Sequence, residues 1–580
     1  MKHILKYIRP YYGYISVTLI IKFIASIMEL LIPSILAKII DEIVPSGDRN
    51  GIFIWGGVMT LCAVVAILGN IVANRMSAVS SGKITLHIRH DLFEKISYLS
   101  ANQLDGFTVP SAISRLTSDT YNLNQLFARM QRIGVRGPIL LIGGLAITLV
   151  MDAGLTLVLV ATLPLIALLV YFVTKKTVPL YTKQQGILDE MVRVVQENIT
   201  GARVIKALSK TEYEKRRYGE VNNRLSDMEQ YLGGIMALTN PGSSLILNIG
   251  LTLVVAVGAF RMDWGLTSPG VIIAFINYFT IILNAMLGIT RIFVMYSKGE
   301  ASALRVAEVL TAPRDLEPIS CEPAESETNA ERKVHIEFRN VSFSYEKVKP
   351  NLEDISFSLG HGQTLGILGS TGSGKSTLIN LLLRFYDVDD GQILIDGRDI
   401  RSYRDDELRT KFGVVFQNDF LFADTVGENI SFFRDIPEGE LERAAADAQA
   451  KEFIDSVGGM SYGVSVRGNN LSGGQKQRLL IARALAKNPE ILILDDASSA
   501  LDYRTDAVLR KALAERYSST TSIIVAQRIS SIKGADLIIV LEGGRMIGRG
   551  THDELMENCP VYRDIAETQM GTGGEAEADE

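Results

Sequence analysis

The residues with the clearest chemical role form a glycine-rich segment at 369–377, GSTGSGKST, which follows the apolar run TLGILG. The segment matches the pattern G-x-x-x-x-G-K-[ST], in which glycines let successive backbone N–H groups close around a phosphate. A helix that begins within the pattern adds its dipole to the same site. Lys375 would neutralise the β- and γ-phosphates, and the Ser376 hydroxyl would ligate Mg²⁺. The predicted phosphate-binding residues are Gly369, Ser370, Thr371, Gly372, Ser373, Gly374, Lys375, Ser376 and Thr377.

A second element, ILILDD at 491–496, supplies a carboxylate that suits the same metal ion. Its apolar start is typical of a central parallel strand, because such strands are buried on both faces. A strand of this kind delivers Asp495 at its carboxyl end, where the side chain can hold the Mg²⁺ shell through water. Many buried strands end in Asp, so the pattern is informative only because it follows a phosphate-binding loop.

The octapeptide LSGGQKQR at 471–478 resembles the signature of the ATP-binding-cassette (ABC) proteins, and IARALAKNP, ILILDD and SALD follow it in the family's order. The resemblance covers essentially the whole chain. It implies that the signature of one chain caps the γ-phosphate of ATP held by another chain. Ser472 and the glycines open a helix whose N-terminus can bind phosphate. The implied signature residues are Leu471, Ser472, Gly473, Gly474 and Gln475, and the implied D-loop residue is Asp502.

Two further site residues follow from the same resemblance. Gln417, in VVFQNDFLF, resembles the Q-loop residue that joins the Mg²⁺ site to the transmembrane coupling helices. Tyr345, in VSFSY, matches the aromatic residue that stacks on adenine. The metal ligands implied for Mg²⁺ are Ser376, Gln417 and, through water, Asp495.

The chain departs from the family at two catalytic positions. After Asp495 the exporters of the family carry Glu as the general base for water, whereas this chain has Asp496. Its carboxylate is one methylene short, and a small misplacement of the attacking water can cost about a hundredfold in rate. After SIIVA, Gln527 replaces the switch histidine. Glutamine can hydrogen-bond a phosphate but cannot carry a proton or a charge.

Both changes are conservative, so harmless drift is the alternative to a degenerate site. They fall in one site while the signature is intact, which favours degeneration. A third departure lies just before the signature, where VSVRG at 464–468 lacks the family's Gly-Glu ahead of Arg-Gly. The missing acid removes one expected contact to the coupling helices.

The elements that must position this chemistry divide the chain in two. Its 580 residues are 47% hydrophobic and 21% charged, which indicates one apolar and one soluble part. Six runs reach the roughly 20 residues that a helix needs to cross a bilayer. They lie at about 14–44, 52–80, 134–151, 154–174, 233–262 and 270–296. The long connections at 80–133 and 175–232 are rich in Lys and Arg. Because positively charged loops stay on the cytoplasmic side, we expect both connections and the C-terminal part to lie on the cytoplasmic side of the cell membrane.

Polar residues inside the apolar runs are costly in lipid and therefore often functional. Asn277, Asn284 and Arg291 recur every seven residues in the sixth run, which puts them on one helical face. Lys22 and Glu29 have the same spacing in the first run. The two stripes would either line a water-filled substrate cavity or hydrogen-bond neighbouring helices.

The fold class that these patterns predict is an α-helical polytopic membrane domain, with six transmembrane helices and long cytoplasmic extensions, fused to an α/β P-loop nucleotide-binding domain. Within the extensions, 106–120 and 196–208 resemble the two coupling loops of ABC exporters. The expected boundaries are 1–13 for an interfacial elbow helix, 14–310 for the membrane domain, 311–333 for a linker, 334–568 for the nucleotide-binding domain and 569–580 for an acidic disordered tail.

Composition excludes other classes. The formal net charge of −6 argues against a nucleic-acid binder. The scattered cysteines Cys62, Cys321 and Cys559 lack metal-ligand spacing, which indicates reduced thiols.

Taken with the resemblance, these patterns predict an ATP hydrolase that exports amphipathic drugs, peptides or lipids as one half of a dimer. The altered P-loop side and the intact signature favour a non-identical partner half-transporter that carries the usual Glu and His. The signature of this chain would then complete the partner's hydrolytic site. The alternatives are an ATP-gated regulatory or channel-like subunit, which would usually carry extra domains, and a homodimeric lipid flippase with two weak sites.

Overall fold

The computed structural model describes residues 2–313, 315–316, 334–345, 347–417, 420–497 and 500–571. They form two compact units, the first of Met1–Tyr98 with Thr108–Ala312 and the second of Leu99–Phe107 with Pro313–Glu580. Most of the expected linker, Cys321 and residues 572–580 of the expected tail lie outside the described residues.

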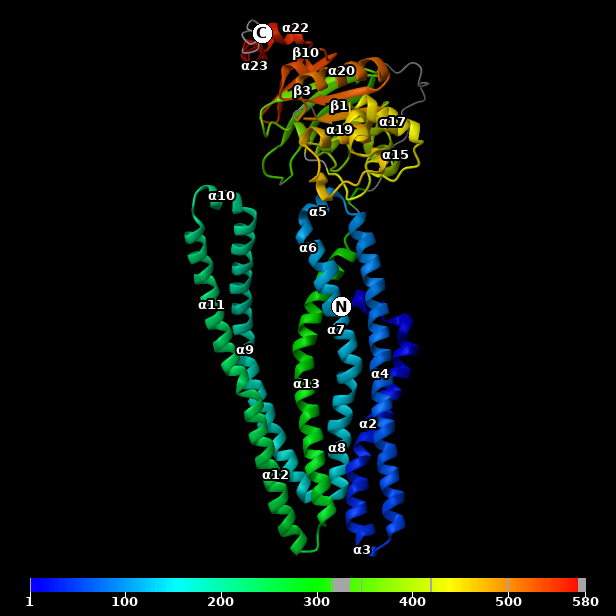
Figure 1. Cartoon of the computed structure of the whole chain (residues 1–580), viewed down its shortest axis with the longest axis vertical. Helices are drawn as coiled ribbons and strands as arrows, with labels where there is room; N and C mark the ends of the chain where they lie inside the picture. Colours follow the sequence, from blue (N-terminus) through cyan, green and yellow to red (C-terminus); the bar gives the residue numbers. More distant parts are fainter. Residues whose placement is uncertain are drawn as a thin grey trace. The chain divides into compact units, whose positions relative to one another are not determined.

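The first unit is built from helices (Figure 1). Their bounds are α1 (Lys2–Leu5), α2 (Tyr12–Lys38), α3 (Val44–Ser46), α4 (Arg49–Ser97), α6 (Val109–Ser114), α7 (Thr120–Arg129), α8 (Val135–Met151), α9 (Ala153–Thr200), α10 (Ala202–Ala207), α11 (Thr211–Ala237), α12 (Thr239–Asp263) and α13 (Pro269–Leu310). Single π-helical turns join several of them, at Ile39–Ile43, Arg115–Asp119 and Met130–Gly134.

Among the described residues, six helical stretches are long and apolar enough to cross a membrane. The first five expected runs each lie within one stretch, and the sixth, 270–296, begins in the stretch Pro269–Ile289 and continues along α13. Figure 1 shows α9 running beside α11 and α12, with α10 at the turn that joins them. Helices α2, α8 and α13 pack around a core that includes Leu30 and Tyr278, whose hydroxyl donates to the Leu30 carbonyl at 2.6 Å. The predicted six-helix membrane domain with long extensions is confirmed.

The second unit alternates strands and helices after a short N-terminal piece. Its helices are α5 (Ala101–Phe107), α14 (Lys375–Leu382), α15 (Asp405–Thr410), α16 (Val426–Ser431), α17 (Glu438–Asp447), α18 (Lys451–Val457), α19 (Gly473–Leu485), α20 (Tyr503–Arg516), α21 (Ile529–Ile532), α22 (His552–Asn558) and α23 (Pro560–Gly571). Its strands are β1 (Val334–Phe343), β2 (Leu352–Gly360), β3 (Thr364–Gly369), β4 (Asp390–Ile395), β5 (Arg398–Asp399), β6 (Phe412–Val415), β7 (Ile491–Asp495), β8 (Thr521–Val525), β9 (Leu537–Glu542) and β10 (Arg545–Gly550).

Two sheets form the body of this unit. The smaller one is antiparallel, in the order β2-β1-β4-β5, and the larger one has the order β10-β9-β3-β8-β7-β6. All neighbours in the larger sheet are parallel except β10 and β9. This arrangement confirms the predicted α/β nucleotide-binding fold, and it brings the carboxyl ends of β3, β7 and β8 to one edge.

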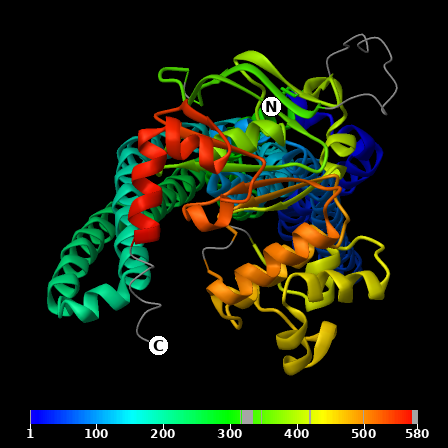
Figure 2. The ribbon, with the colours of Figure 1, turned by 90° about the horizontal axis from the view of Figure 1, so that it is seen from above.

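Successive side chains of a strand point to opposite faces of a sheet, and both faces of the larger sheet are buried. In β7, Ile491 and Ile493 join the core shared with the smaller sheet, whereas Leu492 and Leu494 join the core of α17, α19 and α20. The C-terminal helices pack over β3 and β9 through a separate core. Figure 2 shows these C-terminal helices (red) apart from α17, α19 and α20 (yellow to orange).

Helix α5 belongs with the second unit, although the sequence placed it inside the membrane domain. The Tyr386 hydroxyl donates to Asp105 Oδ2 at 2.6 Å, and Gln103 Nε2 donates to the Pro313 carbonyl at 2.6 Å. The expected coupling segment 106–120 therefore overlaps α5 only at its first two residues. The contact is made by polar side chains that stand before the segment, and the motif alone gave no reason to include them.

The C-terminal helix corrects the expected start of the tail. Helix α23 continues to Gly571, so residues 569–571 are helical rather than part of a disordered tail. Gln569 holds this end, because its Oε1 accepts from the Ile529 N–H and its Nε2 donates to the Gln527 carbonyl, both at 2.8 Å. The change to an acidic composition begins only after this anchor.

Candidate functional site: a phosphate-binding pocket at the carboxyl edge of the sheet

The glycine-rich loop joins β3 to α14, as its sequence predicts. Gly374 has φ +104°, and a Cβ there would lie 2.6 Å from Leu352 Cδ2. Gly372 has φ +81°. L-residues rarely adopt these angles, so the glycines permit a turn that points backbone N–H groups into the loop. Ser373 Oγ is buried and has no hydrogen-bond partner among the described residues.

The charged residues of the loop and of β7 lie next to one another. Lys375 Nζ donates to the carbonyls of Gly369 and Ser370, both at 2.8 Å, and burial lowers the pKa of this lysine. Ser376 Oγ donates to Asp495 Oδ2 at 3.2 Å. Hydroxyl and carboxylate oxygens are the ligands that Mg²⁺ prefers, so this pair fits the predicted ion.

Two adjacent carboxylates end β7. Asp495 is only 5% exposed, and burial raises its pKa. Asp496 has φ +52°, its N–H donates to the Val525 carbonyl at 3.0 Å, and burial raises its pKa as well, although Lys375 opposes the shift. Gln527 Nε2 donates to Asp496 Oδ2 at 3.0 Å, and the Gln417 side chain also bonds this carboxyl group. The two residues that depart from the family are thus direct neighbours.

These groups line one cavity of about 210 Å³. Its lining residues are Asn351, Thr371, Gly372, Gly374, Lys375, Ser376, Thr377, Gln417, Asp495, Asp496, Val525 and Gln527. The fold therefore brings most of the predicted nucleotide site together from four separate stretches of sequence. Asn351 and Val525 were not predicted, because neither belongs to a motif.

Tyr345 lies near this cavity but does not line it. Its hydroxyl accepts from Asn380 Nδ2 at 3.2 Å, and its ring meets Tyr386 edge-on at 5.0 Å. The ring is 38% exposed, which leaves a face on which a planar base could stack.

The signature residues form a separate site at the start of α19. Ser472 is the N-cap, and its Oγ accepts from the Gln475 N–H at 3.3 Å while Gln475 Oε1 accepts from the Ser472 N–H at 2.9 Å. Ser472 and Gly473 are exposed, Gly474 and Gln475 are half-buried, and Leu471 is buried. None of the residues 471–475, all of them described, lines the phosphate-binding cavity.

Asp502, the expected D-loop residue, caps the next helix, α20. Its carboxylate accepts from the Thr505 N–H at 2.8 Å, and this hydrogen bond holds the pKa of Asp502 below its usual range. Ser499, which opens the SALD motif, lies outside the described residues.

In the membrane unit, the first stripe makes contacts between helices. Lys22 is 3% exposed and donates to the side-chain oxygens of Asn70 (2.6 Å) and Asn74 (3.1 Å) on α4. Glu29 accepts two hydrogen bonds from Arg136 of α8, at 2.6 and 2.8 Å. Asn70, Asn74 and Arg136 were missed, although polar groups inside predicted spans were the signal that identified Lys22.

The second stripe is placed differently. Asn277 and Asn284 are exposed on α13, and Asn277 Nδ2 donates to the Ile273 carbonyl of its own helix. The side chain of Arg291 lies outside the described residues. The stripe of Lys22 and Glu29 therefore hydrogen-bonds neighbouring helices, whereas Asn277 and Asn284 of the second stripe are exposed.

Comparison with known families identifies this architecture. Residues 15–286 match the ABC transporter transmembrane region and residues 352–499 match the ABC transporter domain. The uncharacterized ABC transporter ATP-binding protein YfiB of Bacillus subtilis (strain 168) is 33% identical over 577 residues, which cover 99% of each chain. The chain belongs to the ABC transporter family, with the membrane and ATP-binding domains of a half-transporter on one polypeptide.

Two further relatives define the type. An ATP-dependent lipid A-core flippase of Vibrio vulnificus (strain YJ016) is 30% identical over 99% of this chain and 98% of its own. The solved structure of a bacterial Atm1-family ABC exporter with ATP bound superposes with a TM-score of 0.82 at 24% identity, over 96% of this chain and 99% of that one. The protein has the ABC exporter fold and is a multi-pass membrane protein whose ATP-binding domain lies in the cytoplasm.

Proposed function

We propose that this chain exports amphipathic substrates as the degenerate-site half of a heterodimeric ABC exporter. ATP binding and ATPase-coupled transport follow from the family. The finer assignment rests on one observation, the hydrogen bond from Gln527 Nε2 to Asp496 Oδ2. The residue at the general-base position is a short carboxylate bonded to an amide, and a glutamine cannot take up the proton that a histidine could.

The P-loop side is suited to binding. Lys375 and the backbone N–H groups of the loop would hold the phosphates, and Ser376, Gln417 and Asp495 would hold Mg²⁺ directly or through water. The ion, when bound, neutralises charge on the transferring phosphoryl group. Asp496 is left to orient the attacking water, and its short side chain is bonded to the side chains of Gln527 and Gln417. Binding with slow turnover is the expected result.

The signature supports the other half of the proposal. Its capping box sets the first turn of α19, and the N-terminal N–H groups there can bind a phosphate. Because the signature lies apart from the phosphate-binding cavity of its own chain, it would serve an ATP molecule bound by a second subunit. A partner with Glu and His at the two altered positions would form the working site with it.

The substrate class follows from the membrane unit and a relative. Asn277 and Asn284 give α13 an open polar face inside an apolar span, which suits amphipathic molecules. The similarity to a protein named as a lipid A-core flippase keeps lipids within this class.

The decisive experiment measures ATPase activity of this chain alone, of the pair with its partner, and of the double variant Asp496→Glu, Gln527→His purified alone. We expect low activity of the wild-type chain, full activity of the pair, and a gain of about a hundredfold in the double variant. Robust activity of the wild-type chain alone would contradict the heterodimer and favour the homodimeric flippase. ATP-dependent ion conductance without transport in reconstituted vesicles would instead favour the channel-like subunit.

A further inference from the structure

A cluster of two histidines and an aspartate lies at a second, wider cavity of the second unit. This cavity, of about 640 Å³, is lined by none of the residues that line the phosphate-binding pocket. His335, His361 and Asp396 each offer a ligand atom, and these atoms all lie within 4.8 Å of one another. We propose that the cluster binds a divalent transition metal, with Zn²⁺ as the fitting ion.

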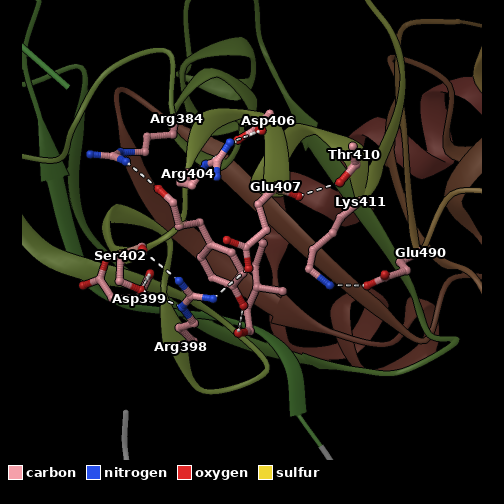
Figure 3. A network of polar contacts seen from close by, with 12 residues as sticks. Arg384, Arg398, Asp399, Ser402, Arg404, Asp406, Glu407, Thr410, Lys411 and Glu490 are labelled. Carbon is pink, nitrogen blue, oxygen red and sulfur yellow. Dashed lines mark hydrogen bonds and ion pairs between the residues drawn. The ribbon is translucent and has the colours of Figure 1, made fainter. Parts of the chain in front are cut away.

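Three separate strand ends bring these residues together. His335 is the second residue of β1, His361 lies in the turn between β2 and β3, and Asp396 lies in the turn between β4 and β5. The Asp396 N–H donates to the His335 carbonyl at 2.8 Å, which fixes the carboxylate beside the first histidine. Arg398, directly after that turn, donates to Ser402 and Glu407 and anchors the same segment (Figure 3).

The hydrogen bonds of Thr521 are compatible with the tautomer of His335 that a metal site needs. Thr521 Oγ1 accepts from the Gly362 N–H at 3.0 Å, and it can donate its single proton to the Gly360 carbonyl at 3.4 Å. It is then left to accept from His335 Nδ1, at 2.7 Å. In the tautomer that would bind a metal, the proton of the neutral imidazole lies on Nδ1, and Nε2 carries the lone pair. A ligating histidine usually donates its other N–H to a neighbouring oxygen in this way.

The lone-pair nitrogen has no partner of its own. His335 is 2% exposed, and its Nε2 is buried without a hydrogen bond among the described residues. Asp396 Oδ2 faces it at 4.0 Å, and Asp396 Oδ1 contacts His361 Nε2 at 2.8 Å. A buried acceptor opposite a carboxylate is costly, and a cation between them removes that cost.

The cations of the cavity wall are engaged elsewhere. Lys411 donates to Glu490 Oε2 at 2.6 Å, as Figure 3 shows. Arg443 pairs with Glu440 at 2.5 Å, and Arg516 pairs with Asp447. These side chains therefore leave the carboxylate of Asp396 to the two histidines.

Two imidazoles and a carboxylate form a ligand set that Zn²⁺ accepts, with bonds of about 2.0–2.2 Å and water in the fourth position. The two rings stack at 4.0 Å with planes 13° apart, whereas a metal must lie in the plane of each ring it binds. His361 must therefore turn, and its side chain is 49% exposed and able to do so. Binding through His361 Nε2 would require the proton of that nitrogen to move to Nδ1 of the same ring, so that the neutral imidazole offers a lone pair. The ion would fasten the first strand of the second unit to two neighbouring turns.

The test uses the full chain, purified through a tag that lacks histidine, stripped with a chelator and titrated calorimetrically with Zn²⁺ in excess Mg²⁺. We expect one Zn²⁺ per chain, and binding at least about tenfold weaker in His361→Ala, which removes an exposed ligand. The matched control is His90→Ala, because His90, Asp91 and Glu94 form an exposed cluster of similar spacing on α4. Its binding should equal that of the wild type.

Two further measurements keep the proposal open to refutation. X-ray absorption should show two imidazoles on the bound zinc in the wild type and one at most in His361→Ala. Zn²⁺ at about a hundred times the wild-type dissociation constant should raise the unfolding temperature of the second unit by about 5 °C in the wild type and in His90→Ala, and by about half as much or less in His361→Ala. Absence of stoichiometric binding, equal binding by His361→Ala, or zinc without histidine ligands would overturn the proposal.

Discussion

At the scale of single residues, the phosphate-binding pocket holds two carboxylates whose ionised forms are destabilised by burial. Asp495 is buried and Asp496 stands beside it, and burial raises the pKa of both. The folded chain therefore binds protons at these groups more readily than the unfolded chain does. Their contribution to stability is present at low pH and is lost as the pH rises through their raised pKa. Near neutral pH both carboxylates destabilise the ligand-free chain.

Replacing the buried carboxylate tests this interpretation. Asp495→Asn should raise the unfolding temperature of the ligand-free second unit at pH 8 and should weaken binding of MgATP. The gain in stability should shrink as the pH falls through the raised pKa of Asp495, because the native carboxyl group then becomes neutral. Thermal unfolding of the variant and the wild type at a series of pH values measures this gain in stability. The exposed Asp455→Asn serves as the control and should change neither quantity. An Asp495→Asn variant less stable than the wild type at every pH would show that the carboxylate stabilises the ligand-free fold instead.

At the scale of elements, helix N-termini carry the chemistry of the signature. Ser472 and Gln475 cap α19 reciprocally, and Thr551 and Glu554 form the same capping box on α22. The two caps stabilise their helices by similar amounts, of the order of 1 kcal/mol each. Only the first lies in the ABC signature, so the pair separates a structural role from a catalytic one.

Variants of the two caps should differ in activity more than in stability. Ser472→Ala combined with Gly474→Asp should lower ATP turnover of the assembled pair by about a hundredfold or more, because contacts to the transferring phosphate are lost. Thr551→Ala should cost about 1 kcal/mol of stability and leave turnover within about twofold. Asp496→Asn should also lower turnover only mildly. Steady-state phosphate release from each variant measures these differences. If Asp496→Asn is the most damaging change, the P-loop site of this chain is the working site and the proposed roles of the two ATP sites are reversed.

At the scale of the whole molecule, the chain leaves the membrane unit after α4, contributes α5 to the second unit and returns at α6. The hydrogen bond from Tyr386 to Asp105 is a polar contact between α5 and the ATP-binding fold. A neutral donor bonded to a carboxylate contributes about 1.5–3 kcal/mol. We expect this contact to be one place where substrate binding and ATP hydrolysis influence each other.

Removing one hydroxyl group should weaken this coupling. We expect Tyr386→Phe to lower the substrate-stimulated part of the ATPase activity by about tenfold while basal activity and ATP affinity stay near wild type. Tyr403→Phe removes a buried hydroxyl that donates to the Ile395 carbonyl in the same unit, and it should leave the stimulation intact. Equal loss of stimulated and basal activity in Tyr386→Phe would indicate a purely structural contact.

The two polar stripes of the membrane unit predict different defects. Asn277→Leu with Asn284→Leu should change substrate-stimulated ATPase activity severalfold and leave unfolding unchanged, because these side chains are exposed. Lys22→Met should lower the unfolding temperature, since it leaves Asn70 and Asn74 without their shared donor. Stability and stimulation measured on the same preparations separate the cases, and a stability defect in the asparagine variant would assign that stripe to packing.

The sequence alone determined the features that depend on neighbouring residues. Six apolar runs predict six spans because crossing a bilayer is a matter of local length and composition. The phosphate-binding loop is equally local, since its glycines, lysine and serine act within nine residues of chain. The order of the motifs then predicted the α/β fold that follows.

Tertiary structure decided what depends on residues far apart in the chain. It set Gln527 against Asp496, Lys22 against Asn70 and Asn74, and His335 against His361 and Asp396. The structure also assigns α5 to the second unit, and in it the last helix continues to Gly571. Strand order and helix packing choose such partners, and no spacing along the chain encodes them. Whether a polar residue is paired, exposed or able to bind an ion is therefore determined only when the helices and strands within each unit pack together.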